Sequence, residues 1–138
     1  MTTTIKKMST IILSLVIAII YLQTLYFKFS AHPDSVYIFS KLNLEPYGRI
    51  GIGILELITA VLIIVPKTRT IGTIVSLSVI LGAIASHLGP LGIEVLGDGG
   101  KVFYLAVVVF VCSAILLWIQ KEELKYLFST LKRKISKS

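Results

Sequence analysis

Long apolar stretches separated by short polar segments form the pattern of hydrophobic and polar positions along this chain. An α-helix needs about 20 apolar residues to cross the hydrocarbon core of a bilayer, and four stretches come close to that length. We therefore predict membrane-spanning helices at residues 9–29, 47–65, 71–88 and 102–120. The fold class that follows is an all-α membrane protein built as a four-transmembrane-helix bundle.

The two ends of the chain differ from the apolar stretches. Residues 1–8 form a basic N-terminus, residues 9–120 form the four-helix membrane domain, and residues 121–138 form a basic tail. Apolar residues recur at helical spacing in that tail, namely Leu124, Leu127, Phe128, Leu131 and Ile135. This pattern predicts a C-terminal amphipathic cytoplasmic helix, which either lies along an anionic membrane surface or binds a soluble partner.

The composition agrees with a membrane protein, because 55% of the residues are hydrophobic and only 15% are charged. The net charge of +7 does not indicate a nucleic-acid partner, since aromatic residues do not interleave with a soluble basic surface. The lipid bilayer is the expected partner instead.

Charge is distributed unequally between the two sides that four helices define. The side that carries both termini holds ten of the 14 lysines and arginines: Lys6, Lys7, Lys67, Arg69, Lys121, Lys125, Lys132, Arg133, Lys134 and Lys137. Loops rich in lysine and arginine stay in the cytoplasm. We therefore expect a multi-pass protein of the cell (inner) membrane with both termini cytoplasmic.

Several kinds of catalytic equipment are absent from the sequence. The single cysteine, Cys112, excludes an internal disulfide, a redox dithiol and a cysteine zinc cluster. Lys101 follows a glycine-rich turn, but Val95 stands where a Walker A motif needs glycine. With no dithiol, metal site or nucleotide motif, the sequence favours a role other than that of an enzyme.

One carboxylate, Glu56, lies near the middle of the second apolar stretch. A charge at such a depth costs about 2.5–3.5 kcal/mol on insertion scales, so it is rarely present without a role. Gly53 and Ala60 flank Glu56 on the same helical face, and small residues allow a neighbouring helix to approach closely. We expect Glu56 to point into the protein rather than into lipid.

Three basic residues at the outer ends of the predicted helices are candidates to meet this acid. Arg49 lies seven residues before Glu56 on the same face and is our first choice of partner. Lys28, which closes the first helix, and His87, which ends the third, are the alternatives. This intramembrane polar site is predicted to be an ion-paired network that only fixes helix packing, a site for a lipid-soluble ligand such as a quinone, or a proton path.

Small residues also predict how the third helix packs. Ser78, Gly82 and Ser86 form a ladder of small side chains at four-residue spacing, which is typical of a packing face in lipid. A second face of the same helix carries Gly72, Ser76, Ala83 and His87.

Three runs of sequence carry a family resemblance: LYFKFSAHPDSVYIFSKL, EPYGRIGIGILELITAVLIIVP, and TRTIG followed by GAIASHLGPLGIEVLGDGGKVF. Together with Lys28, the Arg49 and Glu56 pair, and His87, they make residues 9–120 resemble the DoxX-like family of small bacterial four-helix membrane proteins. That family takes its name from a subunit associated with thiosulfate:quinone oxidoreductase, and relatives include accessory proteins for oxidative-stress complexes and for enzyme maturation. A redox role implied by the resemblance would need a quinone or a partner subunit.

We expect an accessory or scaffold subunit, with a quinone-linked redox complex and a membrane or soluble redox partner protein as the setting that the resemblance implies. Two alternatives stay open. One is a quinone-reactive oxidoreductase component that uses the Glu56 site directly, and the other is a small proton-coupled transporter with Glu56 as its carboxylate.

Overall fold

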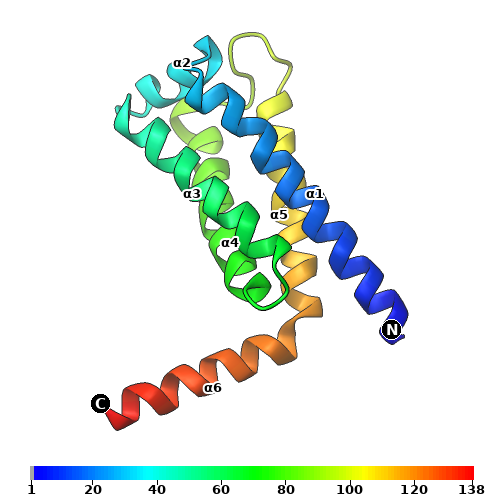
Figure 1. The fold of residues 1–138 in the computed structure, drawn as a ribbon. Helices are drawn as coiled ribbons and strands as arrows, with labels where there is room; N and C mark the ends of the chain where they lie inside the picture. Colours follow the sequence, from blue (N-terminus) through cyan, green and yellow to red (C-terminus); the bar gives the residue numbers. More distant parts are fainter. Residues whose placement is uncertain (1) are drawn as a thin grey trace.

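The computed structural model describes residues 2–138, which fold into helices joined by short loops (Figure 1). The helices are α1 (Thr3–Phe29), α2 (Pro33–Lys41), α3 (Tyr47–Ile64), α4 (Arg69–Ser86), the π-helical turn η1 (His87–Leu91), α5 (Lys101–Ile119) and α6 (Lys121–Lys137). No strand occurs within residues 2–138, so the predicted all-α class is confirmed. By length and composition, α1, α3, α4 with η1, and α5 are each able to cross a membrane.

The first helix begins earlier than the predicted residue 9. The side-chain oxygen of Thr2 accepts a hydrogen bond from the backbone N–H of Ile5 at 3.2 Å, and this N-cap allows the helix to start at Thr3. Most of the predicted basic N-terminus is therefore part of α1.

The four long helices form one bundle in which α1 packs against α3 and α5, and α4 packs against the same two helices. The sequence makes α3 and α4 neighbours through a short turn, and Gly72 sets how closely they approach. A β-carbon added at Gly72 would lie 2.8 Å from the backbone nitrogen of Ile63. Only glycine fits there, so this residue brings the two backbones into direct contact.

The bundle is apolar outside and partly polar inside. Ile19, Val61 and Trp118 expose 61%, 54% and 62% of their surface, while Thr73 and Ser113 are completely buried. Hydroxyl groups inside and bare apolar side chains outside suit a bundle surrounded by hydrocarbon. The four apolar helices therefore indicate an integral membrane protein.

The small residues of α4 divide differently from the prediction. In the predicted ladder, Ser78 and Gly82 are exposed on the outer surface and Ser86 is half-buried, so this face is not buried inside the bundle. Of the second predicted face, Gly72 and Ser76 are buried, and the neighbouring Thr73 is buried with them. The buried residues have hydrogen-bond or close-packing partners outside α4. The hydroxyl of Ser78 instead donates to the backbone carbonyl of Ile74 within α4.

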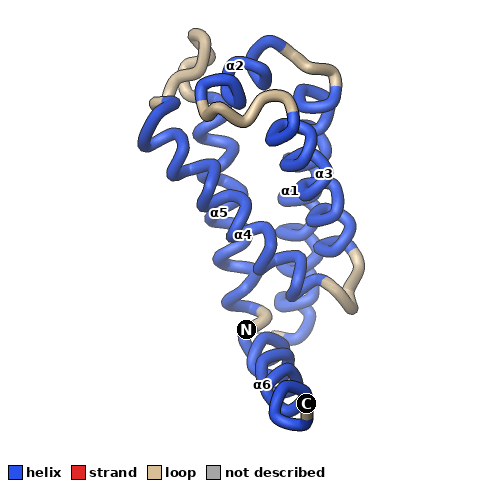
Figure 2. Tube along the Cα trace, turned by 90° about the vertical axis from the view of Figure 1, so that its left-hand side faces the viewer, coloured by secondary structure: helices blue, strands red, loops and turns tan. Residues whose placement is uncertain are grey.

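The tail and the start of α1 lie at the same end of the bundle. Figures 1 and 2 both show α6 turning away from the four-helix core at the end where α1 begins. The ammonium of Lys6 lies 3.7 Å from the carboxylate of Glu123, which links the two helices. No residue within Lys121–Lys137 is buried, in agreement with a helix that is separate from the core.

A loop at the opposite end of the bundle holds the start of α5. The carboxylate of Asp98 accepts backbone hydrogen bonds from Val95, Gly100 and Val102 at 2.9, 2.7 and 3.2 Å. Burial alone would raise the pKa of Asp98. The three N–H donors and nearby His87 outweigh it, so the pKa lies below its ordinary value.

We expect Asp98→Ala to lower the free energy of unfolding at pH 7 by about 1.5–3 kcal/mol, the usual contribution of hydrogen bonds to a charged group. Because the folded pKa is depressed, the carboxylate stabilises the fold above its unfolded pKa of about 3.9 and loses this effect as the pH falls through the folded value. Denaturation at pH 7 and pH 3 should show the difference from wild type shrinking in acid. Glu94→Ala, an exposed change in the same loop, is the control. Equal effects of the two variants would contradict a stabilising role of the hydrogen bonds to Asp98.

Candidate functional site

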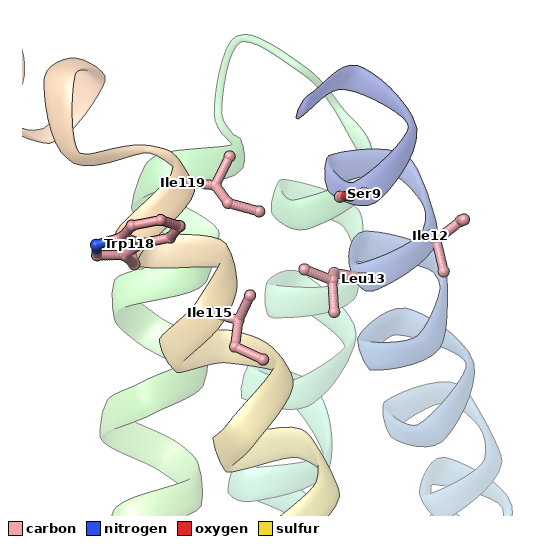
Figure 3. A pocket seen from close by; sticks show the side chains of 6 residues that line it. All are labelled: Ser9, Ile12, Leu13, Ile115, Trp118 and Ile119. Carbon is pink, nitrogen blue, oxygen red and sulfur yellow. The ribbon is translucent and has the colours of Figure 1, made fainter. Parts of the chain in front are cut away.

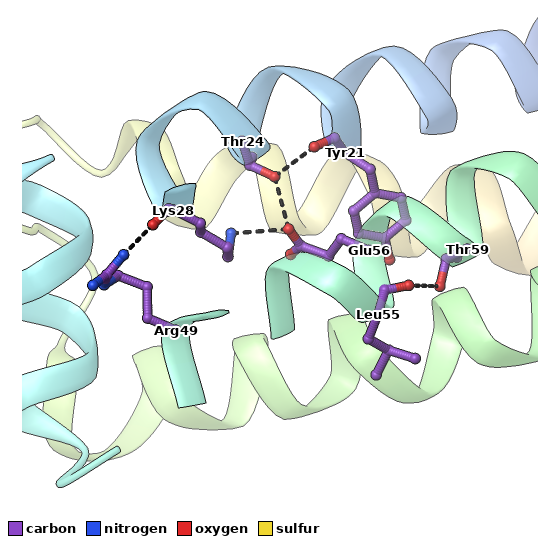
Figure 4. A network of polar contacts seen from close by, with 7 residues as sticks. All are labelled: Tyr21, Thr24, Lys28, Arg49, Leu55, Glu56 and Thr59. Carbon is purple, nitrogen blue, oxygen red and sulfur yellow. Dashed lines mark hydrogen bonds and ion pairs between the residues drawn. The ribbon is translucent and has the colours of Figure 1, made fainter. Parts of the chain in front are cut away.

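The site around Glu56 lies between α1 and α3, as Figure 4 shows. Glu56 is 7% exposed, and its Oε2 atom lies 3.0 Å from the ammonium of Lys28. The hydroxyl of Thr24 donates to the same oxygen at 2.9 Å. Thr24 and Lys28 are four residues apart on α1, so they share the face that meets Glu56. The prediction that Glu56 points into the protein is confirmed, and Lys28 is its partner.

Arg49, our first choice of partner for Glu56, pairs elsewhere. Its guanidinium binds Glu45, with Nε and Nη2 each 2.8 Å from Oε1, and its Nη1 donates to the backbone carbonyl of Lys28. Side chains on a helix lean toward its N-terminus, so Arg49 leans toward Glu45 and away from Glu56, about 10 Å deeper along α3. The prediction was wrong because a shared face does not bring two residues into reach.

His87 also lies outside the Glu56 site. Its Nδ1 atom is 2.8 Å from the carbonyl oxygen of Gly92, and its ring meets the ring of Phe103 edge-on with centroids 5.7 Å apart. The imidazole is buried, with 3% of its surface exposed. These contacts fix the turn after α4. Of the three predicted basic residues, only Lys28 contacts Glu56.

Lys28 connects α1 to α3 through two groups. Its side chain binds Glu56, and its backbone carbonyl accepts from Arg49. Between these contacts, a β-carbon at Gly53 would lie 2.8 Å from a ring carbon of Phe29 and 3.5 Å from the β-carbon of Lys28. The glycine lets α1 approach α3 closely enough for the ion pair to form, which confirms the packing role predicted for it.

A second polar network crosses the bundle and was not predicted. The hydroxyl of Tyr21 on α1 lies 2.9 Å from Oγ of Ser76 on α4, which lies 2.8 Å from Oγ of Ser113 on α5. Nearer to α6, Thr73 donates to the side-chain oxygen of Gln120 at 3.1 Å. Single hydroxyls inside apolar stretches were the available signal, but pairing them requires the relative register of three helices.

The polar contacts of the Glu56 carboxylate are made within the chain. The hydroxyl of Thr24 has one hydrogen and two acceptors within reach, the carbonyl of Tyr21 at 2.8 Å and Glu56 at 2.9 Å. Across residues 2–138, every buried side-chain nitrogen or oxygen atom has a hydrogen-bond partner. A buried acid that is paired with a lysine and accepts from a hydroxyl of the neighbouring helix holds α1 and α3 together.

Two apolar grooves lie at the end of the bundle near α6, away from Glu56. One runs between α1 and α5, with a volume of about 340 Å³, and is lined by Leu13, Ile115 and Ile119 among others (Figure 3). The other lies between α4, α5 and the start of α6. In the described part of the chain, no group of three or more histidine, cysteine, aspartate or glutamate residues is arranged to hold a metal ion.

Comparisons with protein-family models, with curated proteins and with solved structures find no match for this chain.

Proposed function

We propose that this chain is an accessory or scaffold subunit of a membrane complex. The observation that supports the proposal is the Lys28–Glu56 ion pair, which lies between α1 and α3 and is joined by a hydrogen bond from Thr24. A buried charge pair of this kind can specify how helices pack, and it engages the Glu56 carboxylate with Lys28 and Thr24. The surfaces that remain available are those of the apolar helices and of α6.

The proposal extends to the setting of this subunit. We assign the chain to the DoxX-like proteins on its sequence pattern, and we propose a bacterial inner membrane, a quinone-linked redox complex, and a membrane or soluble redox protein as partner. Support comes from the family resemblance of residues 9–120 and from the charge pattern of the chain.

The proposed topology has four spanning helices with both termini in the cytoplasm. Ten of the 14 lysines and arginines belong to the end of the bundle where α1 begins and α6 lies. Reporter fusions after Ser138 and within residues 92–100 should therefore give opposite signals, with the cytoplasmic signal after Ser138. Identical signals, or opposite signals in reversed order, would contradict this topology.

Purification from native membranes in a mild detergent tests the accessory role. We expect a partner protein in fixed stoichiometry, retained through a second purification step and identified by mass spectrometry. A matched preparation with Lys41→Gln, an exposed change at the end of α2, should retain the same partner. A pure chain with neither partner nor quinone would overturn the proposal and favour proton-coupled transport through Glu56.

One observation favours quinone binding as a second candidate function. The ammonium of Lys28 has three N–H donors, its contact with Glu56 uses one, and its side chain is 13% exposed. A quinone carbonyl is an acceptor that such a donor would bind, and the quinone would supply two-electron redox chemistry that the chain itself lacks. Extracted quinone should then be present in wild type and in Lys41→Gln, and absent in Lys28→Met. Its retention in Lys28→Met would contradict binding at this lysine.

A further inference from the structure

The elbow between α5 and α6 is held in place by a buried contact. Gln120, the residue between the two helices, is 5% exposed, and its side-chain oxygen accepts from Thr73 of α4 at 3.1 Å. The backbone N–H of Gln120 also bonds to the carbonyl of Leu116 on α5. The direction in which α6 leaves the bundle is therefore fixed by α4 as well as by α5.

An apolar groove of about 500 Å³ runs into this elbow. Its walls come from α4 and α5, and its end comes from the first turn of α6; the lining includes Leu77, Leu81, Phe110, Leu117, Lys121 and Leu124. Leu81 exposes 51% of its surface, so the groove opens on the outer face of the bundle. Around a membrane-spanning bundle, that face meets lipid acyl chains.

Lys121 places one positive charge where the groove ends. Close to the elbow, Lys125 pairs with Glu122 at 3.2 Å and Lys6 pairs with Glu123 at 3.7 Å. The ammonium of Lys121 instead lies over the ring of Trp118, 5.5 Å from its centroid, and the residue is exposed. Lys121 follows the end of α5 closely, so its ammonium lies at the level where a span ends, which is the level of lipid headgroups.

The rest of α6 has the pattern of a helix that lies in a membrane interface. Phe128, Leu131 and Ile135 expose 60%, 46% and 74% of their surface along one apolar side. The second half of the helix carries Lys132, Arg133, Lys134 and Lys137. Apolar side chains beside clustered positive charge complement an anionic lipid surface, because each lysine or arginine close to it adds about 1 kcal/mol of attraction.

We propose that the α5–α6 elbow binds an anionic phospholipid, with an acyl chain in the groove and its phosphate at Lys121, and that α6 lies on the surface of the same leaflet. The apolar lining fits an acyl chain, and the single uncompensated ammonium at its end fits a phosphate. The inference depends on the membrane placement of the bundle and not on the accessory role.

Trp118, the single tryptophan of the chain, lines both this groove and the groove between α1 and α5, and its fluorescence reports on lipid there. The full-length protein is reconstituted in phosphatidylcholine bilayers that contain brominated phosphatidylglycerol or, separately, the same mole fraction of brominated phosphatidylcholine. We expect the relative association constant from Trp118 quenching to be about fivefold higher for phosphatidylglycerol, the factor that about 1 kcal/mol per lysine corresponds to. In Lys121→Gln the two lipids should quench equally, whereas Lys101→Gln, at the other end of α5, should keep the preference.

Equal quenching by the two lipids in wild type would overturn the proposal, as would a preference that survives in Lys121→Gln. Because Lys121 is exposed, its variant should fold, and an unchanged elution profile and melting temperature in detergent verify this before quenching is measured. A second variant, Phe128→Trp in a Trp118→Phe background, reports on α6. Quenching of that tryptophan by brominated lipid is expected, and its absence would show that the apolar side of α6 is covered by something other than the membrane.

Discussion

Replacing Glu56 with glutamine is expected to lower the free energy of unfolding by about 3–5 kcal/mol, the usual effect of removing one partner of a buried ion pair. The substitution leaves the ammonium of Lys28 between α1 and α3 without its counter-charge, although its side chain is only 13% exposed. Lys28→Met should have a similar effect, because it leaves the carboxylate unpaired. Titration of the detergent-solubilised protein with SDS, followed by circular dichroism, measures both.

Removing the two charges together should recover much of this loss. In the double variant Lys28→Met with Glu56→Gln no buried charge remains, and replacing both partners of a buried pair is often nearly neutral. The sum of the single effects should therefore exceed the double effect by several kcal/mol, which a double-mutant cycle measures. The exposed pair Glu122 and Lys125, 64% and 72% exposed, is the matched control and should show a coupling of about 0.5 kcal/mol or less.

The same variants separate a structural role of Glu56 from a chemical one. If Glu56→Gln keeps its stability and loses quinone or partner binding, the carboxylate is functional before it is structural, and the proposed scaffold role fails. If Glu56→Gln couples to Arg49→Met instead of Lys28→Met, the pairing described here is wrong. Arg49 is expected to couple to Glu45, whose carboxylate it contacts at 2.8 Å.

The sequence predicts well those features that the apolar environment of a membrane requires of any chain. Segments of about 20 apolar residues have few alternatives to spanning helices, and a carboxylate inside one must turn toward protein. Both conclusions need only the local sequence. The four long helices, the inward direction of Glu56 and the packing role of Gly53 were therefore predictable.

The partners of these residues were less predictable because they depend on the relative register of helices. Arg49 and Glu56 share a face of α3. Glu45 lies only four residues from Arg49, however, and its carboxylate is the one that Arg49 binds. Small residues on α4 form two faces. The close approach of the Ile63 backbone to Gly72 shows which of these faces is buried. Periodicity identifies a face, but the neighbouring helix determines its use.

A pair of matched glycine-to-alanine substitutions should distinguish the buried face of α4 from its exposed face by their effects on stability. Gly72→Ala is expected to lower the free energy of unfolding by about 1–3 kcal/mol, the usual effect of overpacking. The added β-carbon would lie 2.8 Å from the backbone nitrogen of Ile63 and 2.9 Å from the carbonyl carbon of Leu62. Neither backbone atom moves aside as a flexible side chain would, so α3 and α4 must separate.

Gly82→Ala on the same helix is expected to have the opposite sign. Nothing lies within 4 Å of a β-carbon at Gly82, and alanine is a better helix former than glycine by about 1 kcal/mol. The SDS titration should therefore show Gly82→Ala at or above wild type and Gly72→Ala below it. If Gly82→Ala is the more destabilising change, the exposed face is a contact face after all, and α4 is rotated from the orientation that buries Thr73 and Ser76.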